Sequence, residues 1–330
     1  MIQKTKLLKY LNIAINAIIF VATYYYIVSV FVDKSISISD FSFEDVFNVK
    51  SIFFLSFLLL LMIINWGIEA LKWKIVSKPI ANFTYLESIK SVLLGIFTGL
   101  FLPNRTGEFI GRVFSNENVN RKELFVHNII ANISQVLVTL IFGLISIIFL
   151  GNFAQYVFSY MGINAVLISI ISSILIFALL LVYFLLPQLS KTKFFRNKLR
   201  NWLSKLKNLP IKTLVTILSL SVLRFLIFSI QYILAFRWLN IPISSLDLIA
   251  LCSIYFLILA VIPSVVFTEI GIRGSVMLIL FMAWFQYSST QINNPEINIL
   301  FATLAIWIIN IIIPAIVGSL FMSKLKILKQ

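Results

Sequence analysis

Uninterrupted apolar runs dominate the chain, and each is close to the roughly 20 residues that a helix needs to cross the hydrocarbon of a bilayer. They cover residues 11–32, 52–71, 124–150, 166–186, 213–239 and 298–321. Of the 330 residues, 60% are hydrophobic and only 12% are charged, about half the charged fraction of a soluble domain. The sequence therefore predicts an all-α, polytopic transmembrane helical bundle of about 6–8 spans, forming a single transmembrane domain over residues 1–330.

The basic residues predict how this bundle is oriented. Lys and Arg outnumber Asp and Glu by 27 to 12, and they gather at the ends of apolar runs, as in Lys72, Lys74 and Lys78 after the second run. Such clusters face the cytoplasm, so we expect a cell-membrane protein with cytoplasmic N- and C-termini. Residues 191–212 separate basic and apolar side chains onto opposite helical faces, which predicts a helix lying on the inner membrane surface. Anionic lipid headgroups, and not nucleic acid, are the expected partners of the excess positive charge.

Two apolar segments are too short and too closely followed by charges to be simple crossings. Residues 91–102 run into Pro103, Arg105, Gly107, Glu108 and Arg112. Residues 248–262 run into Pro263, Glu269, Gly271 and Arg273. A proline ends the incoming helix, and Glu and Arg four residues apart can pair on the next one. The sequence predicts two broken or re-entrant helices, each with a Glu–Arg pair in a hydrated cavity. Whether residues 248–285 form a re-entrant hairpin or two crossings stays open.

These two segments also suggest an internal repeat. Ala70-Leu-Lys-Trp73 precedes the first and Ala235-Phe-Arg-Trp238 precedes the second. An odd number of crossings separates them, so the second copy enters from the opposite side of the membrane. Paired broken helices in inverted repeats are typical of transporter binding sites. We expect repeat halves at about 50–187 and 213–322, joined by the basic segment at 191–212.

An arginine lies halfway along the run at residues 213–239. No acidic residue occurs between Glu123 and Asp247, so Arg224 has no charge partner nearby in sequence. A charge at this depth is costly and needs a carboxylate from across the bundle (Glu69, Glu108 or Glu269) or an anionic ligand. Guanidinium groups bind phosphate oxygens in pairs. The predicted substrate-binding residues are therefore Arg105, Glu108, Arg112, Arg224, Glu269 and Arg273.

The sequence offers little for catalysis. It contains one cysteine, Cys252, and one histidine, His127, which excludes a disulfide framework and a Cys- or His-based metal cluster within one chain. A nucleotide-binding P-loop and an Asp-rich magnesium motif are both absent from the sequence. We therefore expect no catalytic residue, no metal and no cofactor, and a protein that is not an enzyme.

The stretch from Pro103 to Arg112, within this pattern of spans, resembles the membrane domain of the lysylphosphatidylglycerol synthase/flippase family. That family is marked by Pro-x-Arg-x-Gly-Glu after a short apolar segment and by an arginine one turn later. The stretch from Pro263 to Arg273 resembles its later Pro- and Gly-rich segment, although Val265, Val266 and Phe267 stand where the family shows glycines. The resemblance covers most of the chain. It implies a stand-alone membrane domain, because 330 residues leave no room for a soluble synthase domain.

The resemblance also implies a function. We expect a flippase that moves a lipid with a phosphate headgroup between leaflets, either an aminoacyl-phospholipid or a polyprenyl-phosphate-linked lipid. Two alternatives stay open: a non-catalytic membrane partner of a lipid or polysaccharide biosynthetic enzyme, and a lipid-phosphate transferase that uses Glu108 and Glu269 as acid and base. The expected partners are membrane lipids, with a second copy of the chain or a lipid-biosynthetic enzyme as protein partners.

Overall fold

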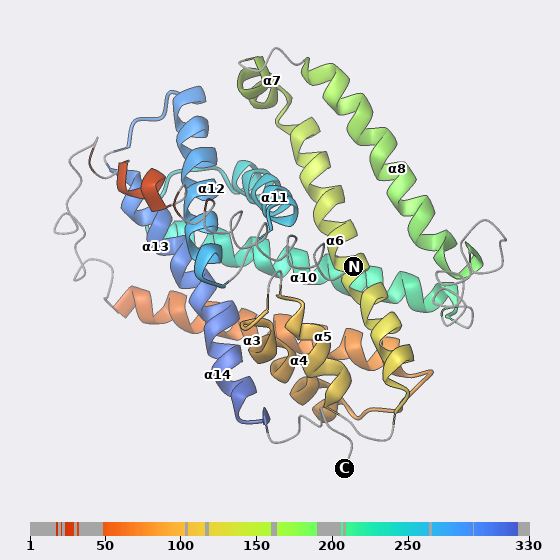
Figure 1. The fold of residues 1–330 in the computed structure, drawn as a ribbon. Helices are drawn as coiled ribbons and strands as arrows, with labels where there is room; N and C mark the ends of the chain where they lie inside the picture. Colours follow the sequence, from red (N-terminus) through yellow and green to blue (C-terminus); the bar gives the residue numbers. More distant parts are fainter. Residues whose placement is uncertain are drawn as a thin grey trace.

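The computed structural model of the chain describes residues 18, 21, 24–29, 32, 49–102, 105–115, 119–159, 164–189, 206, 209–263, 266–292 and 294–322. The regular elements of these residues are helices (Figure 1). Within this part of the chain, six helices are long and apolar enough to cross a membrane. The polytopic helical bundle predicted from the sequence is thereby confirmed.

The long helices follow the predicted apolar runs. They are α3 (Val49–Ser77), α6 (Arg121–Phe149), α8 (Ala165–Leu189) and α10 (Ile211–Trp238), with the short α7 (Gly151–Ser159) between α6 and α8. The last run forms α13 (Pro295–Trp307), the π-helical η4 (Ile308–Ile312) and α14 (Ile313–Ser319). The predicted span at residues 11–32 and the basic segment at 191–212 lie mostly outside the described residues.

The first short apolar segment folds into two helices, α4 (Tyr85–Gly99) and α5 (Gly107–Phe114). A capping box formed by Thr84 and Glu87 begins α4. At about 1.5 Å per residue, α4 is about 22 Å long and α5 about 12 Å, so neither spans the roughly 30 Å of hydrocarbon alone. This agrees with the predicted helix break, although Pro103 itself lies outside the described residues.

Glycines bring α4 and α5 together, backbone against backbone. A Cβ atom at Gly107 would lie 2.0 Å from the carbonyl oxygen of Thr98, and one at Gly111 would lie 2.5 Å from the Cα of Gly95. Any larger side chain at these positions would therefore push the two helices apart. Glu108 and Arg112 each follow one of these glycines, so this contact fixes where their side chains begin.

The second short segment breaks at Pro263 as predicted, but it differs from the first in length. It forms α11 (Ser245–Val261) and α12 (Val266–Tyr287). With 22 residues, α12 is among the helices long enough to cross the membrane, whereas α11 has 17 residues and is about 25 Å long. Glu269 and Arg273 lie in the first turns of α12, and not in a loop before it.

Helices α3 and α10 pack against each other in opposite directions. Hydrogen bonds join Ser51 to Trp238, Leu58 to Gln231, Asn65 to Arg224 and Lys72 to Ser221, so one numbering rises as the other falls. In Figure 1 this pair runs across the view, while α6 and α8 pass it steeply. The other main contacts join α4 to α14 and α6 to α11.

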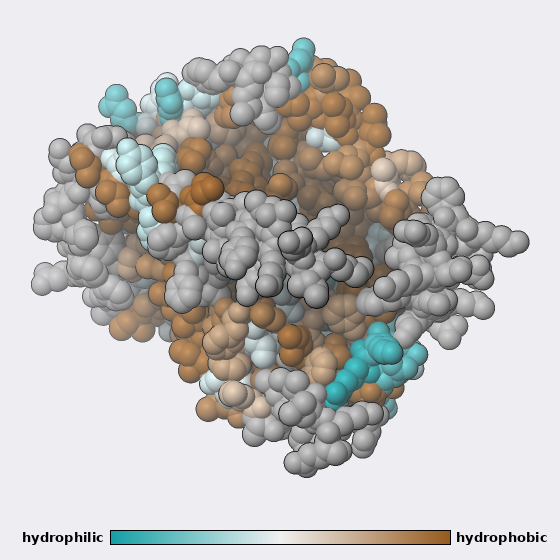
Figure 2. Space-filling model, in the orientation of Figure 1, coloured by the Kyte–Doolittle hydropathy of each residue, from teal (hydrophilic) through white to brown (hydrophobic). Residues whose placement is uncertain are grey.

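The outer surface of the bundle is apolar. Helix α8 packs chiefly on α6, and many of its large side chains are exposed, including Val166, Ile170, Ile174 and Phe177. Figure 2 shows that the described side chains on one face of the molecule are mostly hydrophobic, with a few hydrophilic groups near its edges. Such a surface suits lipid as its solvent, because an apolar patch of this extent is rare on a soluble monomer.

Candidate functional site

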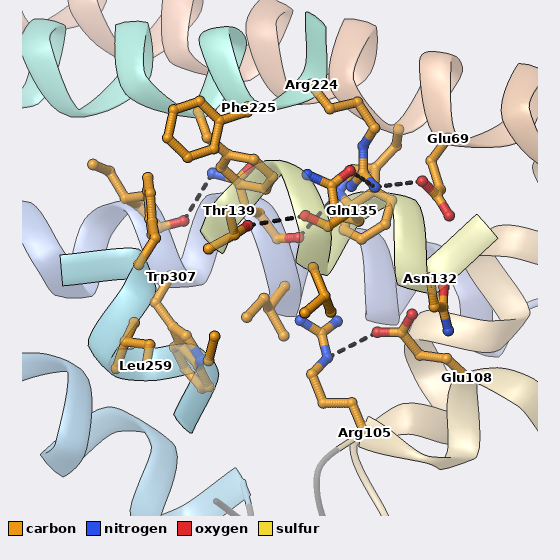
Figure 3. A pocket seen from close by; sticks show the side chains of 18 of the residues that line it. Glu69, Arg105, Glu108, Asn132, Gln135, Thr139, Arg224, Phe225, Leu259 and Trp307 are labelled. Atoms are coloured by element: carbon orange, nitrogen blue, oxygen red, sulfur yellow. Dashed lines mark hydrogen bonds and ion pairs between the residues drawn. The ribbon is translucent and has the colours of Figure 1, made fainter. Parts of the chain in front are cut away.

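The predicted site residues meet at a cavity of about 420 Å³ between α3, α5, α6, α10, α11 and α13 (Figure 3). Its charged lining residues are Glu69, Arg105, Glu108, Arg112, Arg224 and Arg273. Five of the six residues singled out from the sequence are among them. The sixth, Glu269, contacts the cavity through its ion pair with Arg273.

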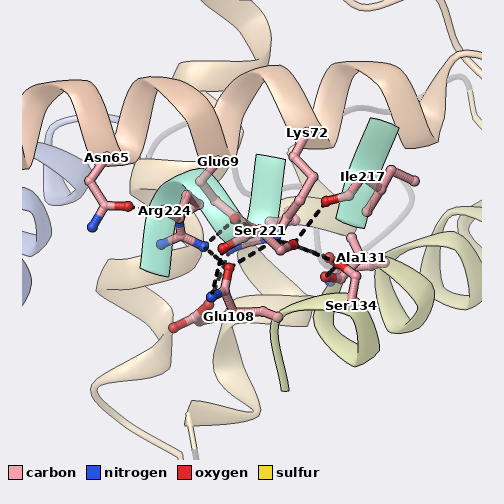
Figure 4. A network of polar contacts seen from close by, with 12 residues as sticks. Asn65, Glu69, Lys72, Glu108, Ala131, Ser134, Ile217, Ser221 and Arg224 are labelled. Carbon is pink, nitrogen blue, oxygen red and sulfur yellow. Dashed lines mark hydrogen bonds and ion pairs between the residues drawn. The ribbon is translucent and has the colours of Figure 1, made fainter. Parts of the chain in front are cut away.

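Glu69 of α3 is the acidic partner that Arg224 requires. Its carboxylate contacts Arg112 Nη1 at 2.6 Å, Lys72 Nζ at 2.8 Å and Arg224 Nη1, and the side chain is almost fully buried. Figure 4 shows Glu69 and Lys72 descending from α3, Glu69 towards Arg224 and Lys72 towards Ser221. A lone buried carboxylate would cost several kcal/mol, and opposite charges with hydrogen bonds offset that cost. Glu69 was not among the predicted binding residues, although the sequence identified it as one of three possible partners of Arg224.

Lys72 corrects the sequence interpretation. The positive-inside pattern grouped it with Lys74 and Lys78 as a cytoplasmic topology signal, but its side chain is fully buried. Its ammonium group lies 3.4 Å from Ser221 Oγ, in addition to its ion pair with Glu69. The signal available in the sequence was the i, i+3 spacing of Glu69 and Lys72, which places both on one helical face.

The motif at the start of α5 forms the predicted ion pair between Glu108 and Arg112. Each of these two residues also pairs with a further charged residue. Arg112 Nη2 lies 3.2 Å from Glu108 Oε2, while Arg105 Nε lies 2.9 Å from Glu108 Oε1. Arg112 therefore bridges Glu108 to Glu69, and Arg105 extends the chain of charges into the cavity. Arg105 has a φ of 54°, in the left-handed region that costs a non-glycine residue free energy. Backbone strain of this kind clusters at functional sites.

Arg224 is held by polar and aromatic groups together. Its Nε donates to Asn65 Oδ1 at 2.8 Å, and its Nη1 lies 3.3 Å from Gln135 Oε1. The guanidinium carbon lies 5.1 Å from the ring centroid of Trp66 and 5.9 Å from that of Phe228. Cation–π contacts contribute free energy beyond simple packing. The side chain is therefore fixed on several sides before any ligand arrives.

The π-helical turn η4 positions Trp66. The indole Nε1 of Trp66 donates to the backbone oxygen of Asn310 at 3.0 Å. That oxygen has no α-helical donor four residues later, because residue 314 is a proline without an N–H. Single π turns inside α-helices are frequent at functional sites. Pro314 thus frees an acceptor that orients Trp66 beneath Arg224.

The second motif forms a separate ion pair. Arg273 donates from Nε at 3.0 Å and from Nη2 at 2.7 Å to the same oxygen, Oε1 of Glu269. This confirms the pairing expected from the i, i+4 spacing. Among the described residues, the ion pairs of Glu69 and Glu108 form one connected network, and Glu269–Arg273 stands beside it.

The remaining wall of the cavity is apolar and aromatic. It includes Phe225, Phe228, Phe256, Leu259 and Ala260 from α10 and α11. Val136 of α6 and Ala260 line the cavity and are also exposed, so the cavity reaches the molecular surface at α6 and α11. The site therefore combines a cationic part with an apolar part that opens towards the outside of the bundle.

The single cysteine and the single histidine of the sequence do not line the cavity. Cys252 is buried in α11, and His127 Nδ1 lies 2.6 Å from the carbonyl oxygen of Val76, a contact that joins α6 to the end of α3. The described residues contain no group of three His, Cys, Asp or Glu side chains able to hold a metal ion. Arginines dominate the charge of the cavity, and guanidinium is suited to binding anions.

The chain is similar to a known protein family over most of its length. The family model described as the lysylphosphatidylglycerol synthase TM region matches residues 17–318. The chain belongs to this family. As a member of the lysylphosphatidylglycerol synthase TM-region family, it is a multi-pass membrane protein with a role connected to membrane lipids. None of the curated proteins compared with the chain matched it significantly.

Proposed function

We propose that the chain is a flippase-like transporter that moves a lipid with an anionic phosphate headgroup between the leaflets of the cell membrane. The observation that carries the proposal is the cavity itself. Four arginines line it against two glutamates, beside an apolar wall that reaches the surface of the bundle. A phosphate lipid has two matching parts: an anionic headgroup for the arginines and an apolar chain for the apolar wall.

In this proposal the cavity replaces the water around the headgroup. A phosphate anion entering hydrocarbon loses its hydration at a high cost, which charge-assisted hydrogen bonds from guanidinium groups offset. Arg105 and Arg224 reach the cavity from opposite sides, as Figure 3 shows. The apolar chain stays against residues such as Phe256 and Leu259 or in the surrounding lipid. Both termini are proposed to lie in the cytoplasm.

Lipid movement in reconstituted vesicles tests the proposal. The full chain is placed in vesicles that contain fluorescent phosphatidylglycerol, and a membrane-impermeant quencher reports how much label reaches the outer leaflet. We expect Arg224→Gln and Arg112→Gln to slow this movement about tenfold or more, since each removes a charge-assisted contact. Arg237→Gln is the matched control, because Arg237 is exposed at the end of α10, outside the cavity.

Two results would favour the alternatives. Equal lipid movement with wild-type and arginine variants would contradict the transporter and favour a non-catalytic partner of a biosynthetic enzyme. Covalent change of a lipid phosphate on incubation with a donor, detected by mass spectrometry, would favour the transferase. Size-exclusion profiles of each variant separate loss of function from loss of folding.

A further inference from the structure

We infer that the cavity selects lipids whose headgroup is a phosphate monoester over lipids that carry an ammonium group. This inference rests on the proposed function and narrows its substrate class. A phosphate monoester carries about −1.5 to −2 charges near neutral pH and presents three non-bridging oxygens. A diester carries one charge and two such oxygens, and an aminoacylated diester adds positive charge.

The first argument is the charge balance. The side chains that line the cavity leave an excess of two positive charges, from four arginines and two glutamates. Lys72 and Glu269, which pair with lining residues, add one charge of each sign and leave the excess unchanged. A headgroup with two negative charges neutralises this excess, whereas a cationic headgroup increases it.

The second argument is that the carboxylates near the cavity are already occupied. Glu69 contacts three cations, Glu108 contacts Arg105 and Arg112, and Glu269 accepts two hydrogen bonds from Arg273. An ammonium group entering the site would have to displace an arginine from one of them. Two of the aromatic side chains that line the cavity, Trp66 and Phe228, are also covered by a cation, because Arg224 lies over both.

The third argument concerns a donor that lacks an acceptor. Arg105 Nη2 is buried and has no hydrogen-bond partner among the described residues, although Glu108 contacts Nε of the same guanidinium. A buried donor without an acceptor is costly, and an entering phosphate oxygen would remove that cost. In Figure 3 Arg105 approaches the cavity from the side opposite Arg224, so an anion in the cavity lies between the two arginines. Three non-bridging oxygens serve this arrangement better than two.

Competitive lipid retention measures this selectivity without requiring transport. The purified full chain is incubated with equal amounts of phosphatidic acid, phosphatidylglycerol, phosphatidylcholine and lysylphosphatidylglycerol with identical acyl chains, and native mass spectrometry counts the retained lipids. We expect phosphatidic acid to be retained about tenfold over phosphatidylglycerol, and more over the other two, as one additional charge-assisted contact predicts. Lowering the pH from about 7.5 to about 5 protonates the monoester and reduces this ratio.

Variants tie the selectivity to the cavity. Arg105→Gln lowers the charge excess and removes the unsatisfied donor, so the ratio of phosphatidic acid to phosphatidylglycerol falls towards one. Arg237→Gln leaves the ratio unchanged. A millimolar excess of inorganic phosphate does not displace phosphatidic acid if the apolar wall contributes to binding. Complete displacement would show a site for free phosphate and overturn the lipid assignment.

The outcomes separate this inference from the proposed function. Equal retention of phosphatidic acid and phosphatidylglycerol, or preferred retention of lysylphosphatidylglycerol, overturns the monoester selectivity. Movement of phosphatidylglycerol in the separate vesicle assay would still leave the proposed function standing. Selective retention of phosphatidic acid without movement of any tested lipid supports the selectivity and contradicts transport.

Discussion

At the scale of single residues, Glu69 connects the charges of the site. Its two carboxylate oxygens contact Lys72, Arg112 and Arg224 from three helices, α3, α5 and α10. Each of these cations is tolerated in the interior because it shares this acid. Glu69 therefore stabilises the fold. Its negative charge also reduces the net positive charge of the cavity that a ligand meets.

Replacing Glu69 tests whether it stabilises the buried cations. Glu69→Gln leaves three buried cations without their shared carboxylate, and loss of one partner of a buried ion pair destabilises a fold by about 3–5 kcal/mol. We expect a clear decrease in thermal stability, measured by the melting temperature of the purified protein. The double variant Glu69→Gln with Lys72→Met should recover part of that loss, since it removes one of the unpaired cations. If Glu69→Gln alone were as stable as the wild type, Glu69 would not be needed to stabilise the three buried cations.

The sequence predicted some of these residues and missed others for a physical reason. Arg224 was recognisable because no acid lies near it in sequence, so its burial demanded a distant partner. Lys72 was not recognisable as a buried residue. A basic residue at the end of an apolar run fits the positive-inside pattern whether it points to water or into the bundle. Only the packing of α3 on α10 distinguishes the two.

At the scale of elements, the contact between α4 and α5 determines the geometry of the first motif. A Cβ at Gly107 or Gly111 would overlap the backbone of α4, and one at Gly95 would lie only 3.0 Å from the carbonyl oxygen of Glu108, so the two helices contact each other through backbone atoms. The sequence located this helix break through its proline and charges. It did not show that the glycines serve close packing, because the partner surface on α4 is formed by carbonyl and Cα atoms that have no sequence signature.

Adding one methyl group to this contact tests it. Gly107→Ala places a Cβ 2.0 Å from the Thr98 carbonyl oxygen, a contact that requires the backbones to separate. Overpacking of this kind costs about 1–3 kcal/mol and displaces Glu108 and Arg112. We expect lower thermal stability together with slower lipid movement in vesicles.

Gly151→Ala is the matched control for this variant, because a Cβ at Gly151 has no neighbouring atom within 4 Å. We expect it to behave as the wild type in both assays. Normal stability and transport in Gly107→Ala would show that α4 and α5 tolerate separation, and that the glycines are not needed to position the motif.

At the scale of the whole molecule, we propose that the two halves of the chain form an inverted repeat. Helices α3 and α10, which carry the two Ala-x-x-Trp sequences, pair with each other in opposite directions. If the halves at 50–187 and 213–322 correspond, the contact of α4 with α14 has its counterpart in the contact of α11 with α6. The sequence suggested the repeat from short motifs, and it could not predict which helices of the two halves contact each other.

Accessibility of the two helix ends tests this arrangement. The C-terminal ends of α3 and α10 are proposed to lie on opposite sides of the membrane, with Lys78 in the cytoplasm and Asn240 outside. Both residues are exposed. In a Cys252→Ala background, an impermeant maleimide should label Asn240→Cys in intact cells and Lys78→Cys only after permeabilisation. Labelling of both variants in intact cells would contradict the inverted orientation.

The surplus of arginines in the cavity also links occupancy to folding. Four like-charged guanidinium groups against two carboxylates repel one another when the cavity holds no anion. A ligand that binds only the folded chain adds its binding free energy to the stability of the fold, in proportion to the logarithm of its concentration. If the proposed function holds, removing the transported lipid during purification would therefore lower the stability of the fold.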